Sequence, residues 1–278
     1  MSTEPAAPRS QHRAAQPLTD EQIAGYLARI GLPDAPEPTV DGLQRLQVAH
    51  VLAVPFENLD IHLGRPIRLD TPTLFDKIVT RRRGGFCYEL NGLFAGLLQG
   101  LGFDVTLVGS GVWLPDGSLS PPTDHLALLV DVDGTWLVDV GFGETFTVPH
   151  RLGEEWAEPA ARFRTVHIEG GWRLQADEGA GWVDVYDVDP SPLRLVEFAA
   201  RCDWHQTDNA SFFRHLPFVS QATSGGRVTI MGEHRIVRAD GVRSEHAVSE
   251  VGGIVDAAQG HFDVTLIEHL RQLSERNR

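Results

Sequence analysis

The hydrophobic periodicity of this sequence changes once, near Gly102, and that change constrains the fold more than any other feature. Before it, apolar residues recur at intervals of three and four, the period of amphipathic helices. After it, short β-branched and aromatic runs are separated by turns such as Pro115-Asp116-Gly117 and Asp133-Gly134, a pattern typical of antiparallel strands. A helical part followed by a strand-rich part predicts an α+β fold.

Four helices are predicted in the first part. The first opens at Thr19, which forms a capping box with Gln22, and stops at Gly31. The others cover residues 43–53, residues 71–80 and a buried segment that begins near Cys87 and runs to about residue 100. The second of the four ends before Pro55, because the residue before a proline is pushed out of helical geometry.

Short strands are predicted over most of the remaining chain. Those at residues 103–114, 125–132, 136–140, 162–168, 171–175 and 182–187 indicate a small barrel or curled sheet over about residues 103–200. Three further strands are expected at residues 227–230, 234–238 and 241–248, and a last helix at residues 264–273. Residues 1–17 are rich in Ala, Pro, Ser and Gln without periodicity, which predicts a mobile tail.

The charge balance argues against two classes of partner. Lys and Arg total 24 against 38 Asp and Glu, and the resulting net charge of −14 repels both nucleic acid and anionic membrane surfaces. The N-terminal residues lack the apolar core of a secretory signal, and apolar runs stay short of the roughly 18 residues that a membrane span needs. We therefore expect a cytoplasmic protein that binds neither nucleic acid nor membranes.

Cysteine and histidine usage argues against a metal centre. The two cysteines, Cys87 and Cys202, are too few for a disulfide framework or a thiolate cage. None of the 12 histidines stands in a His-Glu-x-x-His pattern. We expect no metal site, and each cysteine is considered as a single thiol.

Cys87 is the stronger candidate for a nucleophile. It is predicted at a helix N-terminus, where unpaired N–H groups and the positive end of the helix dipole favour a thiolate. Gly84 and Gly85 precede it, so the backbone can turn sharply into the helix and leave room for a substrate. Cys202 has no such glycines and no cap signature, and we interpret it as a packing residue.

A cysteine nucleophile needs a base, and usually an acid that orients the base. His125 stands at the entrance of an apolar strand, and Asp139 lies among apolar residues where a carboxylate must find a partner. Asp124 and Asp131 are rival acids.

Register does not decide among these acids. A two-residue hairpin at Asp133-Gly134 would set Asp139 opposite Leu128 and His125 opposite Phe142. Asp139 and His125 would then lie about three residues, roughly 10 Å, apart on opposite faces. Spacing alone therefore does not pair the histidine with Asp139, and a bulge, a longer loop or a pre-strand position for His125 is required.

Four motifs together resemble the arylamine N-acetyltransferase family. Arg83-Gly84-Gly85-Phe86-Cys87 is similar to the family's nucleophile motif, and His50 with Val54-Pro55-Phe56-Glu57-Asn58-Leu59 is similar to the end of its upstream helix. Asp124-His125-Leu126 and Leu137-Val138-Asp139-Val140-Gly141-Phe142-Gly143 are similar to its histidine and aspartate motifs, in the same order. The resemblance is strong over about residues 20–150 and weaker beyond.

The resemblance implies a role for each motif residue. Cys87 would be the nucleophile, His125 the partner that yields the thiolate, and Asp139 the residue that orients and charges the histidine. Phe142 and Val112 correspond to positions that line the acceptor pocket, and Phe56 is expected to bind substrate beside them at the cleft.

The resemblance also implies a domain layout. The family's fold is an N-terminal helical bundle carrying the cysteine, a central β-barrel carrying the histidine and aspartate, and a C-terminal α/β lid, with a Cys-His-Asp core like that of cysteine proteases. In this chain the bundle would span residues 18–102, the barrel 103–205 and the lid 206–278, after a disordered tail at 1–17.

The implied activity is acetyl transfer from acetyl-CoA, as co-substrate, to the nitrogen of arylamines or arylhydrazines. It would follow a ping-pong route through a cysteine thioester, in a monomer or homodimer. Two alternatives stay open: an amide synthase that releases or cyclises a polyketide, and a Cys-His-Asp hydrolase. The chain departs from the family's pattern at Gly111, where many bacterial members carry Arg, and at residues 209–213.

Overall fold

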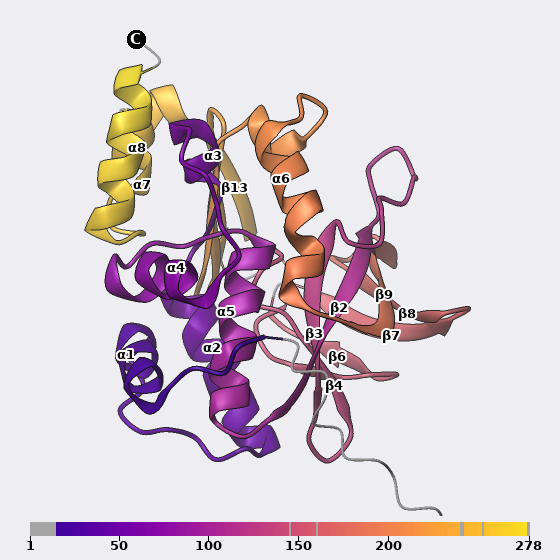
Figure 1. Ribbon diagram of the computed structural model, residues 1–278. Helices are drawn as coiled ribbons and strands as arrows, with labels where there is room; N and C mark the ends of the chain where they lie inside the picture. The colour runs from indigo at the N-terminus through magenta and orange to yellow at the C-terminus, as the bar shows by residue number, and fades with distance from the viewer. Residues whose placement is uncertain (1–14, 145, 160, 240–241, 252, 277–278) are drawn as a thin grey trace, which may run out of the picture.

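Two antiparallel sheets and the helices packed on them make up the fold (Figure 1). The computed structural model describes residues 15–144, 146–159, 161–239, 242–251 and 253–276. In the first part of the chain the helices are α1 (Asp20–Ile30), α2 (Val40–Ala53), α3 (Leu59–Leu63), α4 (Thr71–Phe75), the π-helical turn η1 (Asp76–Thr80) and α5 (Cys87–Gly100).

The ends of the first helix follow the sequence signals. The Gln22 N–H donates to the Thr19 hydroxyl and the Thr19 N–H to the Gln22 side chain, so the predicted capping box forms. Gly31 ends α1 with a φ of 76°, in the left-handed region that favours glycine.

The helix predicted at residues 71–80 changes its hydrogen bonding halfway. It is α-helical only in α4, and the Arg81 N–H then donates to the carbonyl of Asp76, five residues earlier, at 2.8 Å. The prediction was right about helical structure but wrong about an unbroken α-helix, because periodicity does not distinguish an α-helix from a local π-turn.

The packed chain begins earlier than the predicted end of the tail. Ala15 and Leu18 are buried, and the Leu18 N–H donates to the carbonyl of Gly96 in α5 at 3.0 Å. A Cβ at Gly96 would meet the Gln16 carbonyl oxygen at 2.8 Å, so the missing side chain lets this backbone lie directly on α5. Residues 15–17 are therefore part of the packed structure, and residues 1–14 of the predicted tail lie outside the described residues.

An eight-stranded antiparallel sheet follows α5 and curls into a nearly closed, barrel-like shape (Figure 1). Its strand order is β5-β4-β3-β2-β9-β8-β7-β6. The strands are β2 (Asp104–Val112), β3 (His125–Asp131), β4 (Thr135–Val138), β5 (His150–Arg151), β6 (Glu155–Ala157), β7 (Arg162–Ile168), β8 (Gly171–Asp177) and β9 (Val183–Leu193). The curled sheet predicted from the sequence is confirmed.

One face of this sheet packs on α5, which contacts both β2 and β3. The other face encloses a separate core formed by Val108, Ala127, Leu129, Leu137, Phe146, Phe163, Leu174, Tyr186 and Val188. The alternation of side chains along each strand therefore gives the sheet two apolar faces, one for the helices and one for its own interior.

A five-stranded sheet with order β1-β10-β11-β12-β13 forms the rest of the molecule. Its strands are β1 (Phe56–Glu57), β10 (Phe218–Thr223), β11 (Gly226–Met231), β12 (His234–Ala239) and β13 (Val242–Ala247). The accompanying helices are η2 (Leu195–Phe198), α6 (Ala199–Thr207), η3 (Phe212–Arg214), η4 (Val248–Val251), α7 (Ile254–Ala258) and α8 (Val264–Arg276). In the described part of the chain, no helix has both the length and the apolar character to cross a membrane.

The edge strand β1 connects the two halves of the chain. It comes from the helical part and pairs with β10, Phe56 opposite Ser220 and Glu57 opposite Val219. Helix α8 likewise packs on α3 (Figure 1). Two residues are too few to show periodicity, so β1 could not be predicted from the pattern of apolar residues.

Candidate active site

Cys87 is the first residue of α5, as predicted. Phe86 before it is extended (φ −103°, ψ −174°), and its N–H donates to the Glu89 carboxylate at 3.1 Å, which fixes the start of the helix. The Glu57 N–H donates to the carbonyl of Gly85 at 2.8 Å and ties the glycine turn to β1. The nucleophile candidate is thus held by the start of a buried helix.

The register between β3 and β4 differs from the predicted one by one residue. Leu128 lies opposite Val138, not Asp139, because the hairpin loop has three residues, 132–134, rather than two. Asp133 and Gly134 both have positive φ, 48° and 116°, a conformation that glycine and aspartate adopt more readily than most residues. Continued by one residue, this register sets Asp139 opposite Ala127.

That one-residue change decides which side chains meet. Ala127 and His125 lie on the same face of β3, so Asp139 moves from the opposite face to the face of His125. The His125 Nε2 and an Asp139 carboxylate oxygen are 2.8 Å apart, and both side chains are buried. The separation of roughly 10 Å followed from a two-residue hairpin, and the three-residue loop of the structure removes it.

Four donors surround the Asp139 carboxylate. One oxygen accepts from the Asn91 amide at 2.8 Å and the Gly141 N–H at 2.9 Å, and the other from His125 and from the Tyr186 hydroxyl at 3.0 Å. Burial would raise the pKa of Asp139, but His125 and these hydrogen bonds outweigh it and lower the pKa. The carboxylate is therefore ionised, and it fixes the His125 tautomer with the proton on Nε2 and the lone pair on Nδ1.

The sequence did not single out Asn91 or Tyr186 as site residues. Besides Asp139, the Asn91 side chain binds the Leu126 carbonyl at 2.7 Å and the Val140 N–H at 2.9 Å, so it joins α5 to β3 and to the segment that follows β4. Asn91 lies four residues after Cys87, on the same side of the helix, which is a signal that could have found it. Tyr186 reaches the site from β9, and nothing in its local sequence indicates that position.

The two rival acids have other partners. Asp124 pairs with Arg201 at 2.5 Å and with His205 at 3.1 Å, while its own backbone carbonyl accepts from the Tyr88 hydroxyl. Asp131 is exposed and accepts from the Thr135 hydroxyl at 2.7 Å. Neither carboxylate bonds to His125.

Cys87 packs against the loop that follows Asp139. A Cβ at Gly141 would lie 2.8 Å from the Cys87 Cα, so only a glycine allows this approach. Burial raises the pKa of the Cys87 thiol well above its usual value, and a hydrogen bond from the Leu126 backbone acts in the opposite direction. An isolated thiolate is disfavoured here, whereas a thiolate paired with a protonated imidazole carries no net charge and avoids much of that cost.

Cys87 and His125 line one cavity of about 640 Å³. Its wall includes Phe56, Val112 and Phe142, the three residues expected to bind substrate. The lining is completed by Leu114, Pro115, Asp116, Asp124, Gly141, Glu144, His205, Phe212, Phe213 and Phe218. A predominantly apolar cavity of this size with five phenylalanines in its lining suits a small planar ligand.

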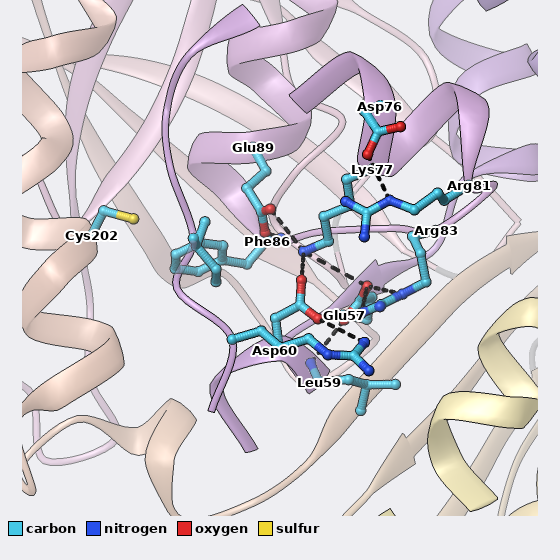
Figure 2. A network of polar contacts seen from close by, with 12 residues as sticks. Glu57, Leu59, Asp60, Asp76, Lys77, Arg81, Arg83, Phe86, Glu89 and Cys202 are labelled. Atoms are coloured by element: carbon cyan, nitrogen blue, oxygen red, sulfur yellow. Dashed lines mark hydrogen bonds and ion pairs between the residues drawn. The ribbon is translucent and has the colours of Figure 1, made fainter. Parts of the chain in front are cut away.

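A buried network of charges lies beside the start of α5 (Figure 2). The Lys77 ammonium is 2.8 Å from the Glu89 carboxylate and 2.9 Å from that of Asp60. The Arg83 guanidinium binds Glu57 at 2.6 Å and Asp60 at 3.1 Å. Burial raises the pKa of Glu89 to about 7 although Lys77 opposes that rise. Arg83 thus belongs to this network and does not line the cavity.

The second cysteine lies apart from the cavity. Cys202 in α6 is buried, receives a hydrogen bond from the Gln206 amide at 3.4 Å, and has a pKa raised by burial. This surrounding agrees with its interpretation as a packing residue. Among the described residues, no group of three or more His, Cys, Asp or Glu side chains is arranged to hold a metal ion.

Comparison with known proteins gives one consistent match. The sequence profile of the N-acetyltransferase family matches residues 39–271. An arylamine N-acetyltransferase / N-hydroxyarylamine O-acetyltransferase of Salmonella typhimurium is 37% identical over 234 residues, which cover 82% of each chain. The arylamine N-acetyltransferase of Mycolicibacterium smegmatis is 34% identical over 253 residues, covering 88% of this chain and 92% of that protein.

Solved structures agree with the sequence matches. The Salmonella typhimurium arylamine N-acetyltransferase superposes with a TM-score of 0.83 at 31% identity and covers 93% of this chain and all of its own. The Mycobacterium marinum arylamine N-acetyltransferase in complex with CoA superposes with a TM-score of 0.84 at 30% identity, covering 91% of this chain and 97% of its own.

Proposed function

The chain belongs to the arylamine N-acetyltransferase family, and from this premise we propose that it transfers acetyl groups from acetyl-CoA to aromatic amines and hydrazines through Cys87. The observation that carries the proposal is the arrangement around one cavity. Cys87 at the start of α5 and His125 both line it, and His125 is hydrogen-bonded to the buried Asp139. Such an arrangement suits nucleophilic catalysis by a cysteine.

In the first half-reaction the Cys87 thiol passes its proton to His125 Nδ1, since Nε2 is held by Asp139. The sulfur then attacks the thioester carbonyl of acetyl-CoA, the new S–C bond forms, and the bond to the CoA sulfur breaks. CoA leaves as a thiol with the proton from His125. Exchanging one thioester for another changes the free energy little, so the step is readily reversible.

In the second half-reaction the amine nitrogen attacks the acetyl carbonyl on Cys87. His125 accepts the proton that the nitrogen loses, and Cys87 leaves as a thiolate. Each half-reaction passes through a tetrahedral oxyanion. The backbone N–H of Cys87 is a candidate donor to it, because the first residue of a helix has no intrahelical acceptor.

We assign the parts of the chain accordingly. Residues 18–102 supply the nucleophile, and residues 103–205 supply His125 and Asp139. Residues 206–278 cover the cavity, which is supported by the presence of Phe212, Phe213 and Phe218 in its lining.

The test is the intact-protein mass after mixing with acetyl-CoA alone, followed by addition of an arylamine. We expect a gain of one acetyl group on Cys87 that is lost when the amine is added. Cys202→Ala should behave as the wild type, and Cys87→Ala should gain nothing while it keeps its circular dichroism spectrum. Acetylation of Cys87→Ala would refute the assignment, and spontaneous loss of the acetyl group at the rate of turnover would indicate a hydrolase.

A further inference from the structure

The charged side chains that line the catalytic cavity share one sign. Three are carboxylates, Asp116, Asp124 and Glu144, and none of the described lining residues is a lysine or an arginine. Any discrimination among acceptors by charge must therefore come from these carboxylates and from the cations that neutralise them.

Two of the three carboxylates are neutralised from outside the cavity. Asp124 is paired with Arg201 at 2.5 Å. Burial would raise the pKa of its carboxyl, but His205 and the hydrogen bonds from Ser120 and Arg201 outweigh burial and lower the pKa to about 2. Glu144 binds the Arg238 guanidinium at 3.1 Å and accepts a hydrogen bond from the Thr229 hydroxyl. The negative charge that each of these two carboxylates presents to a ligand is therefore compensated by an arginine.

Asp116 differs from the other two. Its carboxylate accepts from the backbone N–H of Ser118 at 2.9 Å and from the Ser118 hydroxyl at 2.6 Å, which lower its pKa. Within the part of the chain that the structure describes, it pairs with no cation. It therefore carries a full negative charge at the rim of the cavity.

The loop that carries Asp116 is closed on itself by hydrogen bonds to its backbone. It leaves the end of β2, and the Leu114 N–H donates to the Ser118 carbonyl at 2.8 Å. The Ser120 N–H donates to the Val112 carbonyl at 2.9 Å, and the Ser120 hydroxyl accepts from the Val112 N–H at 2.8 Å. The loop is a closed hairpin, and its hydrogen bonds fix the backbone position from which the Asp116 carboxylate extends.

We propose that Asp116 is a specificity-determining residue that makes this enzyme discriminate against aryl acceptors with an anionic substituent, in favour of uncharged or cationic ones. The proposal rests on the proposed acetyl transfer. A carboxylated arylamine would bring its charge close to Asp116 while its amine reaches Cys87. The pantetheine arm of acetyl-CoA is uncharged, so the donor's reactive end does not meet this repulsion.

The first test does not depend on acetyl transfer. Iodoacetate and iodoacetamide alkylate the same thiol and differ by one negative charge, so the ratio of their rates at Cys87, followed by peptide mass spectrometry, reports the field in the cavity. We expect Asp116→Asn to raise the iodoacetate rate about three- to tenfold at low ionic strength and to change the iodoacetamide rate less than about twofold. The increase should shrink in about 0.5 M salt.

The controls separate charge from loop structure. Asp189 is another exposed carboxylate, and it accepts a hydrogen bond from the backbone N–H of Ser191, two residues later, at 2.9 Å. Asp189 does not line the cavity, so Asp189→Asn is the matched control. It should leave both rates unchanged. Asp116→Glu should keep the wild-type ratio. Equal increases for both reagents in Asp116→Asn would mean that the loop had opened, and this result, like an unchanged ratio or an unreactive Cys87, would overturn the proposal.

The second test uses turnover. At saturating acetyl-CoA, kcat/KM is measured for 4-aminobenzoate and for its uncharged analogue 4-aminobenzamide. Asp116→Asn should raise the benzoate-to-benzamide ratio by the same factor as in alkylation, and an unchanged ratio would contradict the proposal. If the wild type acetylates neither amine and forms no acetyl-enzyme, the proposed function has failed, and the alkylation ratio still decides the role of Asp116.

Discussion

Lys77→Met tests whether the charge network beside α5 is held together as the structure indicates. In the wild type, Lys77 is buried between Glu89 at 2.8 Å and Asp60 at 2.9 Å (Figure 2). The network holds three carboxylates, Glu57, Asp60 and Glu89, against the cations Lys77 and Arg83. Methionine keeps the apolar stem and removes the charge, so Glu89 loses the cation that it contacts.

The size of the effect depends on pH, because protonation of Glu89 removes the unpaired buried charge. Removing one partner of a buried ion pair costs about 3–5 kcal/mol when the other stays charged. In the wild type the pKa of Glu89 is raised by burial from 4.5 to about 7. The folded state thus holds an extra proton between these values, and this group's contribution to stability is lost as the pH rises to about 7.

In Lys77→Met the folded-state pKa of Glu89 rises further, because Lys77 lowers it in the wild type. The loss of stability then continues above pH 7, where the wild-type contribution is already constant. The difference in unfolding free energy between the two proteins should therefore grow with pH, by up to about 1.4 kcal/mol per unit. Below pH 7 the two proteins should differ less.

The measurement is guanidinium unfolding at pH 6.5, 7.5 and 8.5, followed by tryptophan fluorescence. The matched comparison is Lys77→Met in a Glu89→Gln background, where the glutamine can still accept the Phe86 N–H but cannot titrate. There the cost of Lys77→Met should be independent of pH. A pH-independent cost in the Glu89 background, or the same slope in both backgrounds, would refute the reasoning.

Two other predictions concern the pair of His125 and Asp139 and the helix packing. Asp139→Asn should lower kcat/KM about 10³- to 10⁴-fold, because the amide favours the wrong His125 tautomer. The control is Asp131→Asn, which removes the exposed acid of the same hairpin and should change kcat/KM by less than about twofold. A small effect of Asp139→Asn would exclude the role of Asp139 in orienting His125. Gly96→Ala should destabilise the protein by about 1–3 kcal/mol in thermal unfolding, despite the better helix propensity of alanine, because the Cβ would meet a carbonyl oxygen at 2.8 Å. The control is Gly25→Ala, where the nearest atom to the added Cβ would be a phenylalanine side-chain carbon, at 3.3 Å. This substitution should be neutral or mildly stabilising. Equal losses of stability at both glycines would contradict the packing argument.

The sequence by itself determined the parts of the protein that depend on local signals. The capping box at Thr19, the helix start at Cys87 and the strand limits at residues 162–168 follow from spacing and turn chemistry, and the structure has them there. The motif around Cys87 is also local. Its resemblance to the arylamine N-acetyltransferases predicted the family, and the comparisons confirm that family. Such features need only residues that are neighbours along the chain.

Tertiary structure alone decided the features that join distant segments. The partnership of His125 with Asp139 depends on one extra residue in a hairpin loop, because strand side chains alternate and a one-residue slip exchanges the two faces. Tyr186 joins Asp139 from 47 residues away, and β1 joins a sheet whose other strands lie more than 150 residues further on. Local propensity carries no information about these distances, which are fixed only when the cores pack together.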